Sequence, residues 1–237
     1  MNLDSNKEKS LETIVFMMTI ENVHGREMLN KLLEYNIPIT SIIIEHKSKL
    51  SENARSYLKN DFYNPKKVND IIADLQIKTH FVENHNDEQT ENLLQQYNPD
   101  YIVLGNARIL KSNIIQIPKK GILNAHPAIL PKYQGLDCVG WSILNGDSVG
   151  ATAHFIDEGI DSGPIILQET VDYSNCRTLI EVRIMVMKIC AKLLAKSILG
   201  LESGNLIPMK QNISSDHTYP VLSSEQIIQI NNILSSN

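Results

Sequence analysis

Asn124 and His126 are the first pair of residues whose types and spacing suggest chemistry. They lie in an apolar stretch, GILNAHP at residues 121–127, that predicts a strand. Side chains two positions apart share one face of a strand, so the carboxamide and the imidazole can converge on one point. Pro127 ends the strand because it has no N–H to donate to a neighbour. Taken alone, the pair is a weak signal, since a histidine near a strand commonly has a structural role.

Asp161 is the third candidate, in the acidic, glycine-containing loop DEGIDSG at residues 157–163. A carboxylate there could orient a histidine or accept a proton from an attacking amine, whereas an isolated loop aspartate more commonly forms a turn or is solvated. His154 and Asp157 precede it and raise the question of a metal. The sequence has no HExxH and no compact histidine–carboxylate triad, so we expect no metal site.

Three other kinds of site lack support. The segment after the first predicted strand, TIENVHG at residues 19–25, has one glycine and matches neither a dinucleotide-binding loop nor a P-loop. No GxSxG motif is present, which removes the signature of a serine hydrolase.

Composition gives broader expectations. The 237 residues carry a net charge of -5, and 42% are hydrophobic but only 5% aromatic, which predicts an aliphatic core and disfavours a nucleic-acid partner. The three cysteines form no CxxC pair, and the apolar run at residues 13–20 is too short for a secretory or membrane segment. We therefore expect a cytoplasmic protein that does not bind a membrane.

The elements that position these residues alternate between strand and helix patterns. This alternation predicts an α/β fold with a Rossmann-like, mostly parallel sheet flanked by helices and joined by right-handed crossovers. The predicted strands are residues 13–19, 38–45, 79–82, 101–104, 121–125, 151–156 and 164–170, with a further strand considered at 206–210. The predicted helices are residues 25–35, 67–75, 87–96, 138–144, 178–201 and 225–234, and residues 48–62 are expected to form a long connection.

Two consequences follow for the organisation of the chain. The LGNAR segment at residues 104–108 follows a strand, and ligands of open α/β sheets bind at the carboxyl ends of strands, so it is a candidate wall of the site. We expect residues 1–204 to form the catalytic domain and residues 205–237 a short C-terminal extension. That extension is a candidate appendage or oligomer contact, which makes a homodimer one expectation.

Three segments together resemble the folate-dependent formyltransferases. GILNAHPAILPKYQG at residues 121–135 resembles the family's active-site segment, with its Asn-x-His-Pro followed by Leu-Pro and a loop ending in glycine. HFIDEGIDSGP at residues 154–164 resembles the second signature, and GNARIL at residues 105–110 resembles the segment that wraps the pterin ring. The match covers about residues 101–169, and the order and spacing of the three segments make it far more specific than any one of them.

The resemblance implies 10-formyltetrahydrofolate as the formyl donor and an amine as the acceptor. It implies that Asn124, His126 and Asp161 are catalytic: the first two would stabilise the oxygen that becomes negative when the amine attacks, and Asp161 would orient His126 and help take the amine's proton. The residues implied to line the folate pocket, largely through their backbone, are Asn106, Ala107, Arg108, Leu110, Ile156, Asp157 and Gly159. Those implied to border the acceptor are Lys132, Tyr133, Gln134 and Gly135.

The acceptor amine is less defined than the donor. The pattern is most similar to the sugar N-formyltransferases, whose acceptor is an amino sugar linked to a nucleotide. Glycinamide ribonucleotide formyltransferase is the first alternative, although the phosphate loop of that branch is missing from residues 19–26. Methionyl-tRNA formyltransferase fits less well, because it carries a further C-terminal domain and basic surfaces. Formyltetrahydrofolate hydrolase uses the same three residues with water, but normally has an N-terminal regulatory domain.

Overall fold

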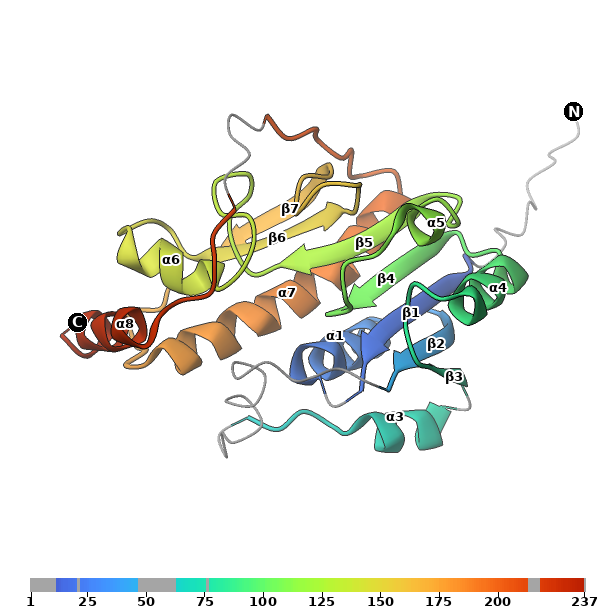
Figure 1. The fold of residues 1–237 in the computed structure, drawn as a ribbon, viewed down its shortest axis with the longest axis horizontal. Coiled ribbons are helices and arrows are strands. Elements are labelled where there is room, and N and C mark those ends of the chain that lie inside the picture. The colour runs from blue at the N-terminus through green and yellow to red at the C-terminus, as the bar shows by residue number, and fades with distance from the viewer. Residues whose placement is uncertain (1–11, 21, 47–62, 76, 213–217, 237) are drawn as a thin grey trace, which may run out of the picture.

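A single seven-stranded sheet forms the centre of the protein, with the strand order β3-β2-β1-β4-β5-β6-β7 (Figure 1). The computed structural model describes residues 12–20, 22–46, 63–75, 77–212 and 218–236. The strands are β1 (Ile14–Thr19), β2 (Ile39–Glu45), β3 (Lys78–Val82), β4 (Tyr101–Gly105), β5 (Gly121–His126), β6 (Gly150–Phe155) and β7 (Ile165–Thr170). The helices are α1 (Val23–Glu34), α3 (Val68–Leu75), α4 (Glu88–Tyr97), α5 (Ser112–Ile115), α6 (Cys138–Leu144), α7 (Leu179–Glu202) and α8 (Ser224–Ser235).

Successive side chains of a strand point to opposite faces, and this alternation divides the core into two layers. In β1, Phe16 and Met18 belong to the hydrophobic cluster that includes α1 and α7, whereas Val15 and Met17 belong to the cluster that includes α4 and α5. Because both faces of the central strands are covered, those strands consist almost entirely of apolar residues.

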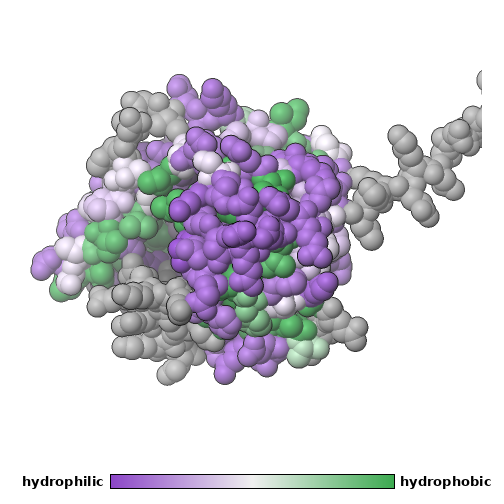
Figure 2. Space-filling view, turned by 45° about the vertical axis from the view of Figure 1, so that its right-hand side comes forward, coloured by the Kyte–Doolittle hydropathy of each residue, from purple (hydrophilic) through white to green (hydrophobic). Residues whose placement is uncertain are grey.

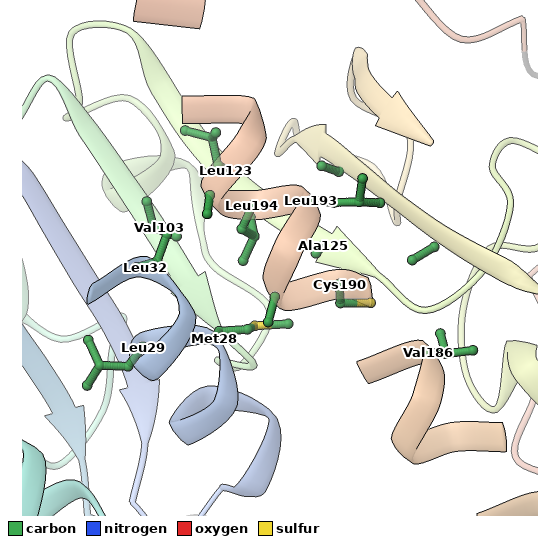
Figure 3. Close-up of a cluster of buried hydrophobic side chains, with 14 of the residues drawn as sticks. Met28, Leu29, Leu32, Val103, Leu123, Ala125, Val186, Cys190, Leu193 and Leu194 are labelled. Atoms are coloured by element: carbon green, nitrogen blue, oxygen red, sulfur yellow. The ribbon is translucent and has the colours of Figure 1, made fainter. Parts of the chain in front are cut away.

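The larger layer is the one built by α1 and α7, and Figure 3 shows its centre. Met28, Leu29 and Leu32 of α1 lie on one side, and Val186, Cys190, Leu193 and Leu194 of α7 lie beside Leu123 and Ala125 of β5. The side chains that fill this space are aliphatic or sulfur-containing, as the low aromatic content predicts. This layer fixes the position of β5, the strand that carries Asn124 and His126.

The predicted fold is confirmed, but one strand, β6, runs in the direction opposite to the others. Strands β1 to β5 are parallel to one another, whereas β6 is antiparallel to β5, and β7, antiparallel to β6, runs in the direction of β1 to β5 again. A parallel crossover has to return the chain to the amino edge of the sheet. The connection after β5 contains only the seven-residue α6, and β6 begins beside the end of β5, with Thr152 opposite His126. The chain therefore re-enters the sheet from the carboxyl edge.

The remaining predicted elements agree with the structure within a few residues, with three exceptions. The single-turn helix α5 was not predicted. The strand considered at residues 206–210 is reduced to one bridge between Met209 and Ile165, because Pro208 has no N–H to extend a ladder. The long connection expected at residues 48–62 lies outside the described residues.

The surface is mainly polar on the face that Figure 2 shows, where hydrophilic residues cover most of the area and hydrophobic ones gather towards one side. Within the described part of the chain, no helix has both the length and the apolar character needed to cross a membrane.

Candidate active site

Asn124 and His126 lie on the same face of β5, as their spacing predicts. Leu123 and Ala125 point into the layer built by α1 and α7, so the two polar side chains point away from it. His126 is only 4% exposed, whereas Asn124 is half-buried. The carboxamide therefore remains open to a ligand, and the imidazole is held by its protein contacts.

His154 lies directly opposite Asn124 in the antiparallel pair of β5 and β6. Its Nδ1 is 2.8 Å from the carbonyl oxygen of Phe155, and because a carbonyl can only accept, Nδ1 carries the hydrogen. Nε2 is then free to accept from the Asn124 amide nitrogen at 3.2 Å. Burial, together with the nearby charge of His126, lowers the pKa of His154 to about 4, so the ring is neutral at pH 7 and can keep this acceptor. The Asn124 carboxamide is thereby oriented by His154.

Asp161 joins the two histidines to a neighbouring loop. Its Oδ2 accepts a hydrogen bond from the backbone N–H of Gly135 at 3.0 Å and lies 3.3 Å from Nδ1 of His126. Its Oδ1 lies 3.8 Å from Nε2 of His154. The backbone of Asp161 is left-handed, with φ of 51°, a conformation that aspartate tolerates better than most residues.

His126 has an oxygen facing each of its ring nitrogens. Nε2 is 2.8 Å from the carbonyl oxygen of Tyr133, and Nδ1 faces the carboxylate of Asp161. A ring that is protonated on both nitrogens donates to both oxygens. The arrangement places a proton donor beside a carboxamide and a carboxylate, which is a set suited to stabilising a developing oxyanion and accepting a proton.

The loop after β5 contains the four residues that the sequence assigns to the acceptor. The ring of Tyr133 is buried and stacks on Tyr219, and its hydroxyl donates to Asp147. Gln134 is also buried and donates to the carbonyl oxygens of Ile160 and Asp161. The side chain of Lys132 is 60% exposed and pairs with Asp147 at 2.6 Å. Any contact of Tyr133 or Gln134 with an acceptor would therefore be made by the backbone, and these assignments stay predictions.

The segment predicted to wrap the pterin follows β4 at the carboxyl edge of the sheet. Asn106 is left-handed, with φ of 61°, and its carbonyl accepts from the Thr19 hydroxyl at 3.4 Å. The guanidinium of Arg108 forms two hydrogen bonds with buried Glu45, one of them from Nε at 2.7 Å. Glu45 has a lowered pKa although burial opposes this, because Arg108 and the backbone N–H of His85 bind its carboxylate. The side chain of Arg108 thus fastens the segment to β2.

The two predicted walls of the folate pocket lie side by side. Ala107 and Leu110 from one wall and Ile156 from the other belong to the same apolar cluster. The hydroxyl of Ser112 donates to Glu158 at 3.0 Å across the two segments. Asp157 accepts from the backbone N–H of Gly159 at 3.1 Å and from the Ser162 hydroxyl at 2.5 Å. These hydrogen bonds within the loop stabilise its conformation.

The sequence does not predict that His154 orients Asn124. It suggests His154 only as a possible metal ligand. The role of His154 depends on the antiparallel register between β5 and β6, which no local pattern in the sequence specifies. Among the described residues, no group of three or more His, Cys, Asp or Glu side chains is arranged to hold a metal ion.

The buried, neutral state of His154 leads to a prediction on stability. Its pKa is about 4 in the folded protein against about 6.5 when unfolded, so the unfolded chain binds more protons between these values. The free energy of unfolding should therefore fall as pH is lowered from about 6.5 to about 4, by at most about 3 kcal/mol from this residue. Urea unfolding of His154→Asn should show a shallower decline than the wild type. The exposed His46→Asn variant should keep the wild-type slope, and an unchanged slope in His154→Asn would contradict the assignment.

Comparisons with known sequences identify curated relatives of part of the chain. The methionyl-tRNA formyltransferase of Clostridium beijerinckii is 38% identical over 120 residues, which are 50% of this chain and 39% of that relative. The methionyl-tRNA formyltransferase of Alkaliphilus oremlandii is 32% identical over 158 residues, which are 62% of this chain and 51% of that relative. The chain thus spans about half the length, or less, of the curated relatives it matches.

Solved structures share the fold over more of the chain. Glycinamide ribonucleotide transformylase 1 from Symbiobacterium toebii aligns with a TM-score of 0.64 and 19% identity, over 85% of this chain and 95% of that one. A 4-N formyltransferase from Francisella tularensis aligns with a TM-score of 0.60 and 18% identity, over 93% of this chain and 86% of that one. The family described as formyl transferase matches residues 6–199, well over half of the sequence. The chain therefore belongs to the formyl transferase family.

Proposed function

We propose that this protein transfers a formyl group from 10-formyltetrahydrofolate to a primary amine. One observation carries the proposal: Asp161 lies 3.3 Å from His126 and 3.8 Å from His154, and His154 in turn binds Asn124 at 3.2 Å. This places a carboxamide, an imidazole and a carboxylate together, beside the segment at residues 105–110. Enzymes of the family in general use 10-formyltetrahydrofolate as the donor, which supports the same donor here.

The donor would be held by the two adjoining walls described above, with the pterin between residues 105–110 and residues 156–160. These walls would suit a flat heterocycle because three of their side chains, Ala107, Leu110 and Ile156, are apolar and belong to one cluster. The tie between Arg108 and Glu45 would keep the first wall in place before the donor binds.

The residues of the site have separate tasks in this reaction. As the amine nitrogen bonds to the formyl carbon, negative charge develops on the formyl oxygen, and the Asn124 amide would donate a hydrogen bond to it. The Nδ1–H of His126, whose contact with Asp161 is 3.3 Å, would be shared between that carboxylate and the formyl oxygen. Asp161, with its carboxylate beside His126, would accept the proton that the amine loses, directly or through a water. The bond between the carbon and the folate nitrogen then breaks, and that nitrogen takes up a proton. The products are a formamide and tetrahydrofolate.

Two acceptor classes are put forward for the amine. The first is a nucleotide-linked amino sugar, which the similarity of the sequence pattern to the sugar N-formyltransferases implies, although the comparisons do not favour it. The curated relatives are methionyl-tRNA formyltransferases by name, which makes methionyl-tRNA the second candidate, although the chain spans only 39% of the relative from C. beijerinckii. The net charge of -5 argues against binding a polyanion.

Loss of a catalytic group should reduce the rate far more than the stability. We expect His126→Ala and Asp161→Asn each to lower kcat by at least about 100-fold, because removing one donor to an oxyanion typically costs two to three orders of magnitude. Tetrahydrofolate release measures the rate, and circular dichroism checks that each variant folds. Lys78→Ala, at an exposed position on the edge strand β3, is the control and should keep wild-type kcat. Near-normal turnover in either folded variant would refute the assigned roles.

The acceptor is identified by a panel assayed with 10-formyltetrahydrofolate. The panel contains nucleotide-linked 3-amino and 4-amino sugars, glycinamide ribonucleotide and methionyl-tRNA, and one reaction is run without an acceptor. We expect turnover with an amino sugar and little change in KM between 50 and 200 mM salt. Turnover confined to methionyl-tRNA, with affinity that falls steeply over this salt range, would instead establish the second candidate.

A further inference from the structure

Two glutamine side chains hold the backbone around Asp161. Gln211 donates from Nε2 to the carbonyl oxygens of Asp161 at 2.8 Å and of Gly163 at 2.7 Å. Gln134 donates to the same Asp161 carbonyl at 3.2 Å and to that of Ile160 at 3.1 Å. Both side chains are buried. The main chain that presents the Asp161 carboxylate is therefore fixed by hydrogen bonds from two different segments.

The orientation of the Gln211 amide is unambiguous, because the reverse orientation would place its oxygen against two carbonyl oxygens. Both hydrogens of Nε2 are used, while Oε1 is buried and has no hydrogen-bond partner among the described residues. A buried polar atom without a partner costs about 1–3 kcal/mol, so a glutamine serves stability poorly at this position. The two hydrogen bonds that Gln211 donates, to the carbonyls of Asp161 and Gly163, therefore explain why a glutamine stands here.

Gln211 is well anchored, although it lies beyond the last long helix of the core. Two residues earlier, Met209 exchanges both backbone hydrogen bonds with Ile165, at 2.7 and 2.8 Å. Upstream of that, Leu206 packs on Gly200 of α7 and donates its N–H to the Gly200 carbonyl at 3.1 Å. The amide of Gln211 is thus presented from a segment tied to both α7 and the start of β7.

A small shift in the backbone of residues 161–163, which accepts these hydrogen bonds, would move the Asp161 carboxylate. Asp161 is in the left-handed region, and Gly163 lies so close to the carbonyl of Phe155 that no Cβ would fit. This backbone sets the direction of the Asp161 carboxylate, whose Oδ2 lies 3.3 Å from Nδ1 of His126. A displacement of about 1 Å at a reacting group can cost about 100-fold in rate.

The same C-terminal stretch also holds the loop on the other side of the carboxylate. Tyr219 donates its N–H to the Gln134 carbonyl at 2.7 Å and accepts from the Leu136 N–H at 2.8 Å, which flanks Gly135, the donor to Asp161. Figure 1 shows the chain leaving the end of α7 and running beside β7 up to residue 212, and residues 218–222 lying beside the loop after β5. The C-terminal extension thus contacts both loops that hold the carboxylate.

We propose that Gln211 is a positioning residue for catalysis, which holds the Asp161 carboxylate at His126 through the backbone of residues 161–163. The role rests on the proposed function, because it acts through Asp161. It gives the C-terminal extension a direct part in the active site.

The test compares Gln211→Met, which keeps the size of the side chain and removes both donors, with Asn231→Ala in the same extension. Asn231 also makes a structural hydrogen bond, but it lies in α8 and accepts from the Leu179 N–H of α7 at 2.8 Å rather than binding the Asp161 loop. We expect Gln211→Met to lower kcat at least about 10-fold, with KM for the donor within about twofold of wild type. Asn231→Ala should lower Tm and keep kcat within about twofold.

Gln211→Asn keeps the amide but shortens its reach by one methylene, and it should lose about 3- to 10-fold in kcat. Wild-type kcat in a folded Gln211→Met or Gln211→Asn variant would overturn the proposal. An equal loss of kcat in Asn231→Ala and Gln211→Met would also overturn it, because the effect would then follow stability alone.

A readout that needs no formyl transfer separates this proposal from the proposed function. The ¹⁵N resonances of the His126 ring, assigned with His126→Gln, report where the Asp161 carboxylate lies. We expect them to shift in Gln211→Met and to stay in place in Asn231→Ala. Unchanged His126 resonances in Gln211→Met would overturn the positioning role even if the wild type transferred no formyl group, whereas a shift would support it independently of the reaction.

Discussion

The hydrogen bond from the Gly135 N–H to the Asp161 carboxylate is the interaction on which the rest of the site depends. It joins the loop after β5 to the loop after β6, and the oxygen it binds is the same one that faces His126. If this bond were lost, His126 would keep its contact with the Tyr133 carbonyl but lose its charged neighbour. The glutamines that hold residues 160–163 and the C-terminal stretch that holds residues 134–136 act in support of this one contact.

The change of direction in the sheet after β5 has an equally specific consequence. Because β6 returns antiparallel, His154 comes to lie opposite Asn124, and its burial keeps the ring neutral and able to accept from the carboxamide. A parallel strand in this place would have a different register and would not provide this partner. The packing of α7 under β5, with α1 beside α7, holds the strand on which the arrangement is built (Figure 3).

Local pattern was enough to predict the layered fold, because buried parallel strands read as apolar runs and amphipathic helices have their own period. It was also enough to place Asn124 and His126 on one face, since that follows from strand geometry alone. Contacts between segments that are distant in the sequence could not be predicted from local pattern. The pairing of His154 with Asn124, of Arg108 with Glu45 and of Gln211 with the Asp161 carbonyl each depends on register or on a loop path that no neighbouring residues specify.

The fate of the formyl carbon shows whether the site delivers the formyl group to an amine. The protein is mixed with 10-formyltetrahydrofolate labelled with ¹³C in the formyl group, with and without the amine panel, and the label is followed by NMR. We expect the label to appear as a formamide on one amine, to do so only when His126 is present, and to remain on the donor when no amine is added. Release of the label as formate at the same rate with and without amines would contradict this expectation, because the site would then be delivering the formyl group to water.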